Sequence, residues 1–243
     1  MLSAVLHKFF PIKSDDLNAF PREVWLENTL KKLPSGLRIL DAGAGEQSKK
    51  QYCTHLDYVS QDFAQYDGKG NGEGLQTASW DQNSLDIVSD ITDIPEADES
   101  FDAIMCIEVF EHLPDPLAAL DEFYRLLKPN GYLIITAPFA SFTHFAPYYF
   151  STGFSKYWYT YWLDKKKFAI EELIPNGNFS SFLLQELNRI PYICKTYMER
   201  EKISRIDKII LHMALYLLSK MLLSDKKSDE LCCFGYHCLA RKQ

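Results

Sequence analysis

The sequence lacks the cysteine spacing of a zinc site or a thiol–disulfide redox motif. None of its six cysteines forms a CxxC pair, and no histidine cluster accompanies them. Cys106 lies inside an apolar, strand-like run, so we expect reduced and mostly buried thiols in a cytoplasmic protein. No spacing of acidic residues singles out a cage for a hard cation, and the sequence therefore predicts no metal.

Basic residues are scarce. Lysine and arginine together number 26 against 33 acidic residues in 243, which gives a net charge of −7. The densest basic run, residues 165–167, is short. Binding to the phosphates of nucleic acid needs clustered basic side chains, so we expect no nucleic-acid partner.

Long apolar runs without charges are also missing. The first 16 residues lack the apolar core and cleavage site of a signal peptide. Residues 206–223 are strongly apolar but contain Lys208 and Lys220, whereas a membrane span needs about 20 mostly apolar residues. We expect a packed helix here. The alternative is peripheral membrane contact or self-association through residues 201–223.

Apolar runs alternate with amphipathic segments in the first 138 residues. Strands are expected over residues 37–43, 56–63, 85–91, 100–110 and 131–138. Helices are expected over residues 21–33 and 47–56 and after Asp115, which can cap the clearest helix of the chain. Alternation at this spacing predicts crossover connections and a parallel sheet with helices on both faces.

The character of the chain changes after residue 138. Residues 139–164 are dense in aromatic side chains, and residues 167–177 predict another strand ended by a turn. Two helical stretches follow near residues 179–195 and 201–223, and residues 234–242 predict a last strand.

The stretch "RILDAGAGEQ" places an acid and two glycines where the first strand ends. Glycine allows a positive φ and lets the backbone approach a ligand closely, which marks Asp41, Gly43 and Gly45 as a candidate site. In an open parallel sheet, ligands bind beyond the carboxyl ends of the strands, so acids at several strand ends are expected to converge.

Two further acids end the next strands. Asp62 suits the hydroxyls of a ribose, and Asp90 followed by Ile91 suits the amino edge and face of an adenine. A dinucleotide-binding loop needs a third glycine where this chain has Ser48, and Glu46 opposes a pyrophosphate. Charge therefore favours S-adenosylmethionine, which carries a sulfonium and an ammonium, over NAD.

Together these motifs resemble those of class I S-adenosylmethionine-dependent methyltransferases. The matching text is "LDAGAGE", "YVSQDF", "SDITDIPEADESFDAIMCIEVFEHLPDP" and "LKPNGYLIITAP", within residues 36–139. The resemblance implies that Asp62 binds the ribose and that Ile107 forms a wall after the fourth strand. It also assigns Asp41, Gly43 and Gly45 to the methionine part, and Asp90 and Ile91 to the adenine.

The resemblance implies an α/β fold, a Rossmann-like three-layer sandwich with a seven-stranded, mostly parallel sheet and an antiparallel last strand. One departure is the length of residues 176–230, which predicts a helical cap inserted before the last strand. We expect a single methyltransferase domain over residues 1–243. Its expected parts are an N-terminal helix (1–35), the cofactor-binding core (36–139), an aromatic substrate segment (140–164), the cap and a last strand (231–242).

A hydroxyl acceptor benefits from a general base, and two histidines are candidates. His112 follows the fourth strand, in a Glu-His pair similar to that of several small-molecule O-methyltransferases, and His144 follows the fifth. Both also have an ordinary structural interpretation, as turn or surface residues. Tyr148 and Tyr149 are candidates for stacking on the substrate.

The predicted function is methyl transfer from S-adenosylmethionine to a small molecule. The segment "HFAPYYFSTGF" looks like a subgroup linked to glycan and secondary-metabolite pathways, which predicts O- or N-methylation of a sugar or lipid-linked glycan intermediate. The alternatives are a module that binds the cofactor without turnover and an NAD-dependent oxidoreductase.

Overall fold

The computed structural model of the chain describes residues 10, 12, 16–77, 79–198 and 203–243. Contacts divide the chain into two compact units, which we describe separately: residues 22–174 with 235–243, and residues 1–21 with 175–234. The expected single domain over residues 1–243 stays a prediction beside this division. Most of the segment considered as a signal peptide lies outside the described residues.

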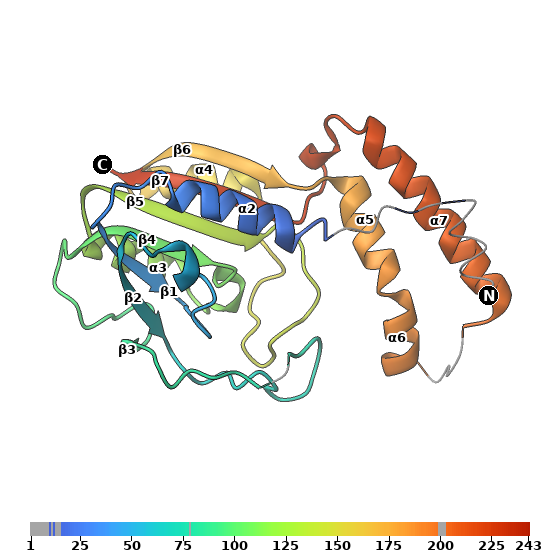
Figure 1. Ribbon diagram of the computed structural model, residues 1–243, viewed down its shortest axis with the longest axis horizontal. Coiled ribbons are helices and arrows are strands. Elements are labelled where there is room, and N and C mark those ends of the chain that lie inside the picture. The colour runs from blue at the N-terminus through green and yellow to red at the C-terminus, as the bar shows by residue number, and fades with distance from the viewer. Residues whose placement is uncertain (1–9, 11, 13–15, 78, 199–202) are drawn as a thin grey trace. The chain divides into compact units, whose positions relative to one another are not determined.

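The larger unit is built on a seven-stranded sheet with the order β3-β2-β1-β4-β5-β7-β6 (Figure 1). Strands β1, β2, β3, β4 and β5 run parallel in their pairings, and β7 is antiparallel to β5, as predicted. The bounds are β1 Arg38–Ala42, β2 Asp57–Asp62, β3 Ile87–Val88, β4 Phe101–Ile107, β5 Leu127–Pro138, β6 Phe168–Asn176 and β7 Gly235–Lys242.

Helices cover both faces of this sheet. Helix α2 (Ala19–Leu30) lies over one face, and α4 (Lys156–Lys165) lies on the other (Figure 1). Phe110 contacts Phe123 of α3 (Pro116–Leu126) and Trp158 of α4, which places α3 and α4 on the same side. The result is the predicted three-layer α/β sandwich.

The core explains why the strands are continuous apolar runs. On the α2 side, fully buried side chains from the helix and three strands form one cluster, which includes Leu26, Leu30, Ile39, Ala103, Met105 and Ile134. Their strand neighbours Leu40, Ile104 and Ile135 are also fully buried. Since successive strand residues face opposite sides, the sheet is covered on both faces.

Helix α3 forms as its sequence predicts. The carboxylate of Asp115 accepts hydrogen bonds from the backbone N–H groups of Leu117 and Ala118, both at 3.0 Å. Pro116 occupies the first helical position, where the missing N–H costs nothing. The cap and the proline fix where the chain turns back after β4.

Two sequence predictions fail here. No α-helix forms over residues 47–56, where the structure has only a 3₁₀ helix at Lys50–Tyr52. Gln47 has a positive φ of 57°, and Ser, Tyr, Cys and Thr in this stretch are weak helix formers. The strand expected over residues 85–91 shrinks to the two residues of β3, because this edge strand pairs only with the end of β2.

The smaller unit contains the helices of the inserted segment. These are α5 (Phe179–Asn188), α6 (Ile190–Tyr197) and α7 (Arg205–Ser224), so the stretch expected near residues 179–195 is two helices. Leu184 of α5 packs with Leu215 and Leu218 of α7.

Within the described residues, no helix combines the length and the apolar character that crossing a bilayer requires. Contact of residues 201–223 with a membrane or with another copy stays a prediction, and residues 201 and 202 lie outside the described residues.

In the larger unit, β7 carries a buried histidine against α2. The ring of His237 is 4% exposed and stacks on Trp25 with ring centroids 4.8 Å apart. Burial, and the nearby charge of Arg22, lower the pKa of His237 from 6.5 to about 4. Its Nε2 is buried and has no hydrogen-bond partner among the described residues. The fold therefore holds this imidazole neutral.

We predict that His237→Phe reduces the acid sensitivity of the fold. Between pH 6.5 and pH 4 the unfolded chain binds a proton at His237 and the folded chain does not, so stability falls as the pH falls through this window. The loss approaches about 3 kcal/mol at pH 4, from about 1.4 kcal/mol per pKa unit. Urea unfolding of both proteins at pH 7, 5.5 and 4 measures it. Parallel stability profiles for the two proteins would contradict the assignment.

Candidate functional site

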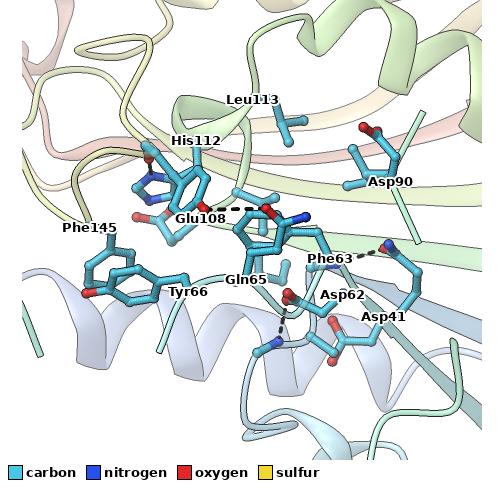
Figure 2. A pocket seen from close by; sticks show the side chains of 18 of the residues that line it. Asp41, Asp62, Phe63, Gln65, Tyr66, Asp90, Glu108, His112, Leu113 and Phe145 are labelled. Atoms are coloured by element: carbon cyan, nitrogen blue, oxygen red, sulfur yellow. Dashed lines mark hydrogen bonds between the residues drawn. The ribbon is translucent and has the colours of Figure 1, made fainter. Parts of the chain in front are cut away.

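A cavity of about 620 Å³ opens at the carboxyl ends of the parallel strands. Figure 2 shows its two sides. The carboxylates of Asp41, Asp62 and Asp90 lie on one side, and His112 and Phe145 lie on the other. The three acids at three strand ends therefore share one cavity, as the sequence predicts.

The glycine loop after β1 is held against the end of β2. The N–H groups of Gly43 and Ala44 both donate to the carbonyl oxygen of Gln61 at 2.9 Å. Gly43 has a φ of +79°, and a Cβ atom at this position lies only 2.5 Å from a methyl carbon of Val109. Both the backbone angle and the space require glycine here.

Asp62 joins this loop to the cavity. Its Oδ2 accepts the N–H of Gly45 at 2.9 Å, and its Oδ1 accepts the N–H of Ala64 at 2.9 Å. The amide of Gln82 adds a longer contact of 3.3 Å to Oδ1. A carboxylate has about four acceptor positions, so Asp62 keeps capacity for one further donor from a ligand.

Asp41 is buried at the base of the same side. Its Oδ2 accepts the hydroxyl of Tyr58 at 2.6 Å. Burial raises the pKa of Asp41 to about 7, with the tyrosine and the charge of Lys49 acting in the opposite direction. A cationic ligand beside Asp41 stabilises its charged form.

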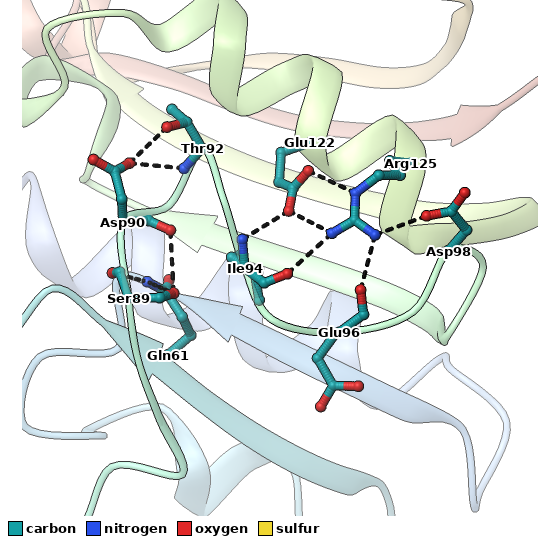
Figure 3. A network of polar contacts seen from close by, with 9 residues as sticks. All are labelled: Gln61, Ser89, Asp90, Thr92, Ile94, Glu96, Asp98, Glu122 and Arg125. Carbon is teal, nitrogen blue, oxygen red and sulfur yellow. Dashed lines mark hydrogen bonds and ion pairs between the residues drawn. The ribbon is translucent and has the colours of Figure 1, made fainter.

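A polar network positions the loop that carries Asp90 (Figure 3). The guanidinium of Arg125 donates to the carboxylate of Glu122 and to the carbonyl oxygens of Ile94 and Glu96. Glu122 also accepts the N–H of Ile94 at 2.8 Å. The helix α3 thereby fixes the chain just after β3, which leaves the Asp90 side chain at the cavity.

The sequence reasoning missed Arg22, a cation that lines the cavity from α2 and lies 3.0 Å from Glu108. Lys49 is the other lining cation, and it pairs with Glu23. Six acidic side chains line the same cavity: Asp41, Glu46, Asp62, Asp90, Glu108 and Asp115. This excess of acids suits a cationic nucleoside such as S-adenosylmethionine and opposes a pyrophosphate.

Aromatic side chains also line the cavity. They are Phe63, Tyr66, Trp80, Phe145, Tyr148 and Phe150. Tyr66 and Phe145 stack with ring centroids 4.8 Å apart, and the ring of Phe145 stacks on His112. The aromatic composition of residues 139–164 pointed to that segment, but it did not point to Trp80. Trp80 lies in the glycine-rich loop and covers Gly45.

Glu111 lies between the two candidate histidines. Its Oε1 is 3.6 Å from Nε2 of His112 and 3.7 Å from Nε2 of His144, and its side chain is 1% exposed. His112 Nδ1 donates to the Tyr148 carbonyl at 2.5 Å, and His144 Nδ1 donates to the Phe142 carbonyl at 2.8 Å. Both Nε2 atoms therefore lack a hydrogen in the neutral rings.

The two rings differ in basicity. Burial lowers the pKa of His112, and the attraction of Glu111 offsets only part of this effect. Burial also lowers the pKa of His144, but hydrogen bonding to Glu111 and to the carbonyl of Phe142 outweighs it, so the pKa of His144 is raised overall. A proton on this group therefore rests on His144 more readily than on His112.

The predicted residues divide by their place at the cavity. His112 and Tyr148 line the cavity, whereas His144 and Tyr149 do not. Tyr149 donates its hydroxyl to the Ser141 carbonyl at 2.7 Å. The residues expected at the cofactor all line the cavity: Asp41, Gly43, Gly45, Asp62, Asp90, Ile91 and Ile107. Their individual roles stay predictions.

Comparison with known proteins identifies the family. Residues 18–190 match the family of the methyltransferase domain, so the chain belongs to that family. The class recognised from the sequence motifs, the class I S-adenosylmethionine-dependent methyltransferases, is confirmed.

Two curated relatives match about the same share of the chain. A ubiquinone biosynthesis O-methyltransferase of Xylella fastidiosa is 32% identical over 121 residues, covering 46% of this chain and 47% of that enzyme. A demethylmenaquinone methyltransferase of Clavibacter sepedonicus is 34% identical over 104 residues, covering 42% and 41%. The chain spans less than half the length of these relatives.

Solved structures share the fold. A putative sarcosine dimethylglycine methyltransferase from Galdieria sulphuraria aligns with a TM-score of 0.53 at 16% identity, covering 92% of this chain and 86% of that one. A putative methyltransferase from Bacillus halodurans aligns with a TM-score of 0.52 at 17% identity, covering 90% and 98%.

We predict that Gly43→Ala weakens binding of S-adenosylhomocysteine by at least about tenfold, because the added methyl group displaces Val109 and strains a φ of +79°. Gly36→Ala is the matched control, since its φ is +81° but a Cβ there meets nothing within 4 Å. Calorimetric titration measures both. Equal affinities for the two variants would show that the cavity tolerates a side chain at position 43.

Proposed function

We propose that this protein transfers a methyl group from S-adenosylmethionine to a hydroxyl group on a small acceptor with a flat ring. The observation that carries the proposal is the division of one cavity into an acidic side and a side lined by aromatic rings and His112. The acidic side suits a cationic nucleoside, and the aromatic side suits an acceptor ring that stacks.

The cofactor is assigned to the acidic side. Asp62 accepts one ribose hydroxyl, Asp90 and Ile91 hold the adenine, and Ile107 forms a wall. Asp41 with the loop of Gly43 and Gly45 holds the methionine end. When bound, the cofactor supplies a methyl group on a sulfonium, whose neutral leaving group makes the transfer depend mainly on positioning.

Arg22 is assigned to the carboxylate of the methionine end. It lies on helix α2, its Nη1 is 3.0 Å from Glu108, and it lines the cavity. A guanidinium binds a carboxylate through two parallel hydrogen bonds, which fixes orientation as well as affinity.

The acceptor is assigned to the aromatic side, with its hydroxyl toward His112. Nε2 of His112 carries no hydrogen and is buried beside Glu111, so the ring turns toward the cavity before it takes the hydroxyl proton, and Glu111 stabilises the charge that results. Tyr148 orients His112 through its carbonyl and lines the cavity itself. His144 acts behind Glu111, since it does not line the cavity.

The names of the relatives support transfer to oxygen, since they include ubiquinone biosynthesis O-methyltransferases. The sugar or glycan intermediate expected from the sequence remains a prediction. An aromatic wall accommodates a sugar ring or an aromatic ring by stacking, so the acceptor class needs a direct experiment.

The test is a gain of one methyl group in an acceptor. The purified full chain is incubated with deuterated-methyl cofactor and two matched sets, catechol-like phenols and sugars or glycolipids, and products are followed by mass spectrometry. We expect labelled phenol ethers. Labelled sugars alone would favour the glycan prediction. A third incubation uses cell extract as the source of acceptors, and tight cofactor binding with no labelled product there would favour a binding module without turnover.

We predict that His112→Gln and His144→Gln each lower kcat under saturating cofactor and acceptor. The loss expected on removing general-base assistance is about 10²–10⁴-fold. Affinity for S-adenosylhomocysteine should stay within about threefold, because neither histidine is assigned to the cofactor. Unchanged turnover in both variants would leave positioning as the whole of the catalysis.

A further inference from the structure

The group of Glu111, His112 and His144 has the features of a metal site that the sequence does not reveal. One donor atom from each residue lies within 4.8 Å of the donors of the other two. Glu111 and His112 are adjacent in the chain, whereas His144 reaches the group from the loop after β5. This loop is tied down where residues 75 and 144 form an isolated parallel bridge.

Both imidazoles are already oriented as ligands. Each Nδ1–H donates to a backbone carbonyl, that of Tyr148 or of Phe142, which leaves each Nε2 lone pair directed toward Glu111. Histidines that bind metals usually donate their other ring N–H in this way, which fixes both tautomer and ring orientation.

The donors are unsatisfied without a cation. Oε2 of Glu111 and Nε2 of His112 are buried and have no hydrogen-bond partner among the described residues. With neutral rings, two lone pairs face a carboxylate that is 1% exposed, and no hydrogen lies between them. A positive ion at the centre of the group satisfies all three donors at once.

We propose that Glu111, His112 and His144 bind one transition-metal dication of the zinc class. Two imidazoles with one carboxylate are a common set of protein ligands for catalytic zinc and for non-haem iron, whereas magnesium prefers an all-oxygen shell. Around a tetrahedral ion with bonds of about 2.1 Å, neighbouring ligand atoms are roughly 3.4 Å apart. The donor atoms of this group are somewhat farther apart than that, so metal binding draws them closer together.

An ion at this position borders the acceptor side of the cavity, because His112 lines that cavity. Its open coordination positions suit the oxygen of a hydroxyl acceptor, which it polarises as a Lewis acid in place of a free imidazole. This use of the ion rests on the proposed function, whereas binding of the ion does not.

The test measures binding without any acceptor. The full chain is stripped with chelator, dialysed and titrated with Zn²⁺ by calorimetry, and the bound metal is counted by mass spectrometry. We expect one equivalent of Zn²⁺ and no uptake of Mg²⁺ at the same micromolar concentrations. The variants Glu111→Gln and His144→Gln should each weaken Zn²⁺ binding by at least about 100-fold. His55→Gln, at a histidine bonded to the carbonyl of Leu30, is the matched control and should bind as the parent does.

Two readouts keep the result clear. Replacing zinc by Co²⁺ should give visible bands of a low-coordinate site without thiolate charge transfer, which separates this group from the free cysteines. Titration with S-adenosylhomocysteine in every variant reports that the cavity is intact. Loss of zinc with retained cofactor binding supports the proposal. No zinc uptake by the parent chain, or equal uptake by both ligand variants, overturns it. Failure to bind S-adenosylhomocysteine instead contradicts the proposed function.

Discussion

The hydrogen bond from the Gly45 N–H to the Asp62 carboxylate is the contact on which the cavity depends. With the two N–H groups that donate to Gln61, it ties the loop after β1 to the end of β2. The glycines allow the backbone angles of this loop, and Asp62 ties the loop to the sheet. Because the acids are fixed by the fold, a ligand meets a site that is already organised. The cost is a carboxylate, Asp41, that burial drives toward its neutral form, with a pKa of about 7. A cation beside it reverses that shift, which links the electrostatics of this loop to the charge of its ligand.

The other side of the cavity is built differently. Cofactor contacts are assigned to strand ends, whose spacing is fixed by the sheet, whereas the acceptor side is made by two loops packed on each other. Gly70 and Gly74 lie against the carbonyls of Ala146 and Thr143, where a Cβ would approach to 2.0 and 2.6 Å. The pairing carries Phe145 onto His112 and Tyr66. Folds of this kind host different acceptors by varying such loops while the strand ends keep their role.

The same division explains how much the sequence could predict. Features set by neighbours along the chain were predictable: the alternation that gives the parallel sheet, the cap at Asp115 and the acids at strand ends. Features set by distant partners were not. The length of β3, for example, depends on how much of β2 remains to pair with. One local feature also escaped prediction: residues 47–56 form no α-helix because Gln47 has a positive φ that no periodicity reveals. Arg22 reaches the cavity from α2, and Arg125 reaches the loop of Asp90 from α3, so neither lies near the motif it serves.

Glu111 and Asp41 pose the same physical problem in one protein. Each is a carboxylate almost removed from water, and a positive partner stabilises a buried carboxylate. Asp41 has Tyr58 and a distant lysine, and its pKa shows that these do not suffice. Glu111 has two imidazoles whose hydrogens point away from it toward backbone carbonyls. A cationic ligand can stabilise Asp41, but that ligand lies on the other side of the cavity from Glu111. A positive charge beside Glu111 therefore has to come from its own surroundings, as a proton on His144 or as an ion bound by Glu111, His112 and His144. The orientation of both imidazole rings favours the ion.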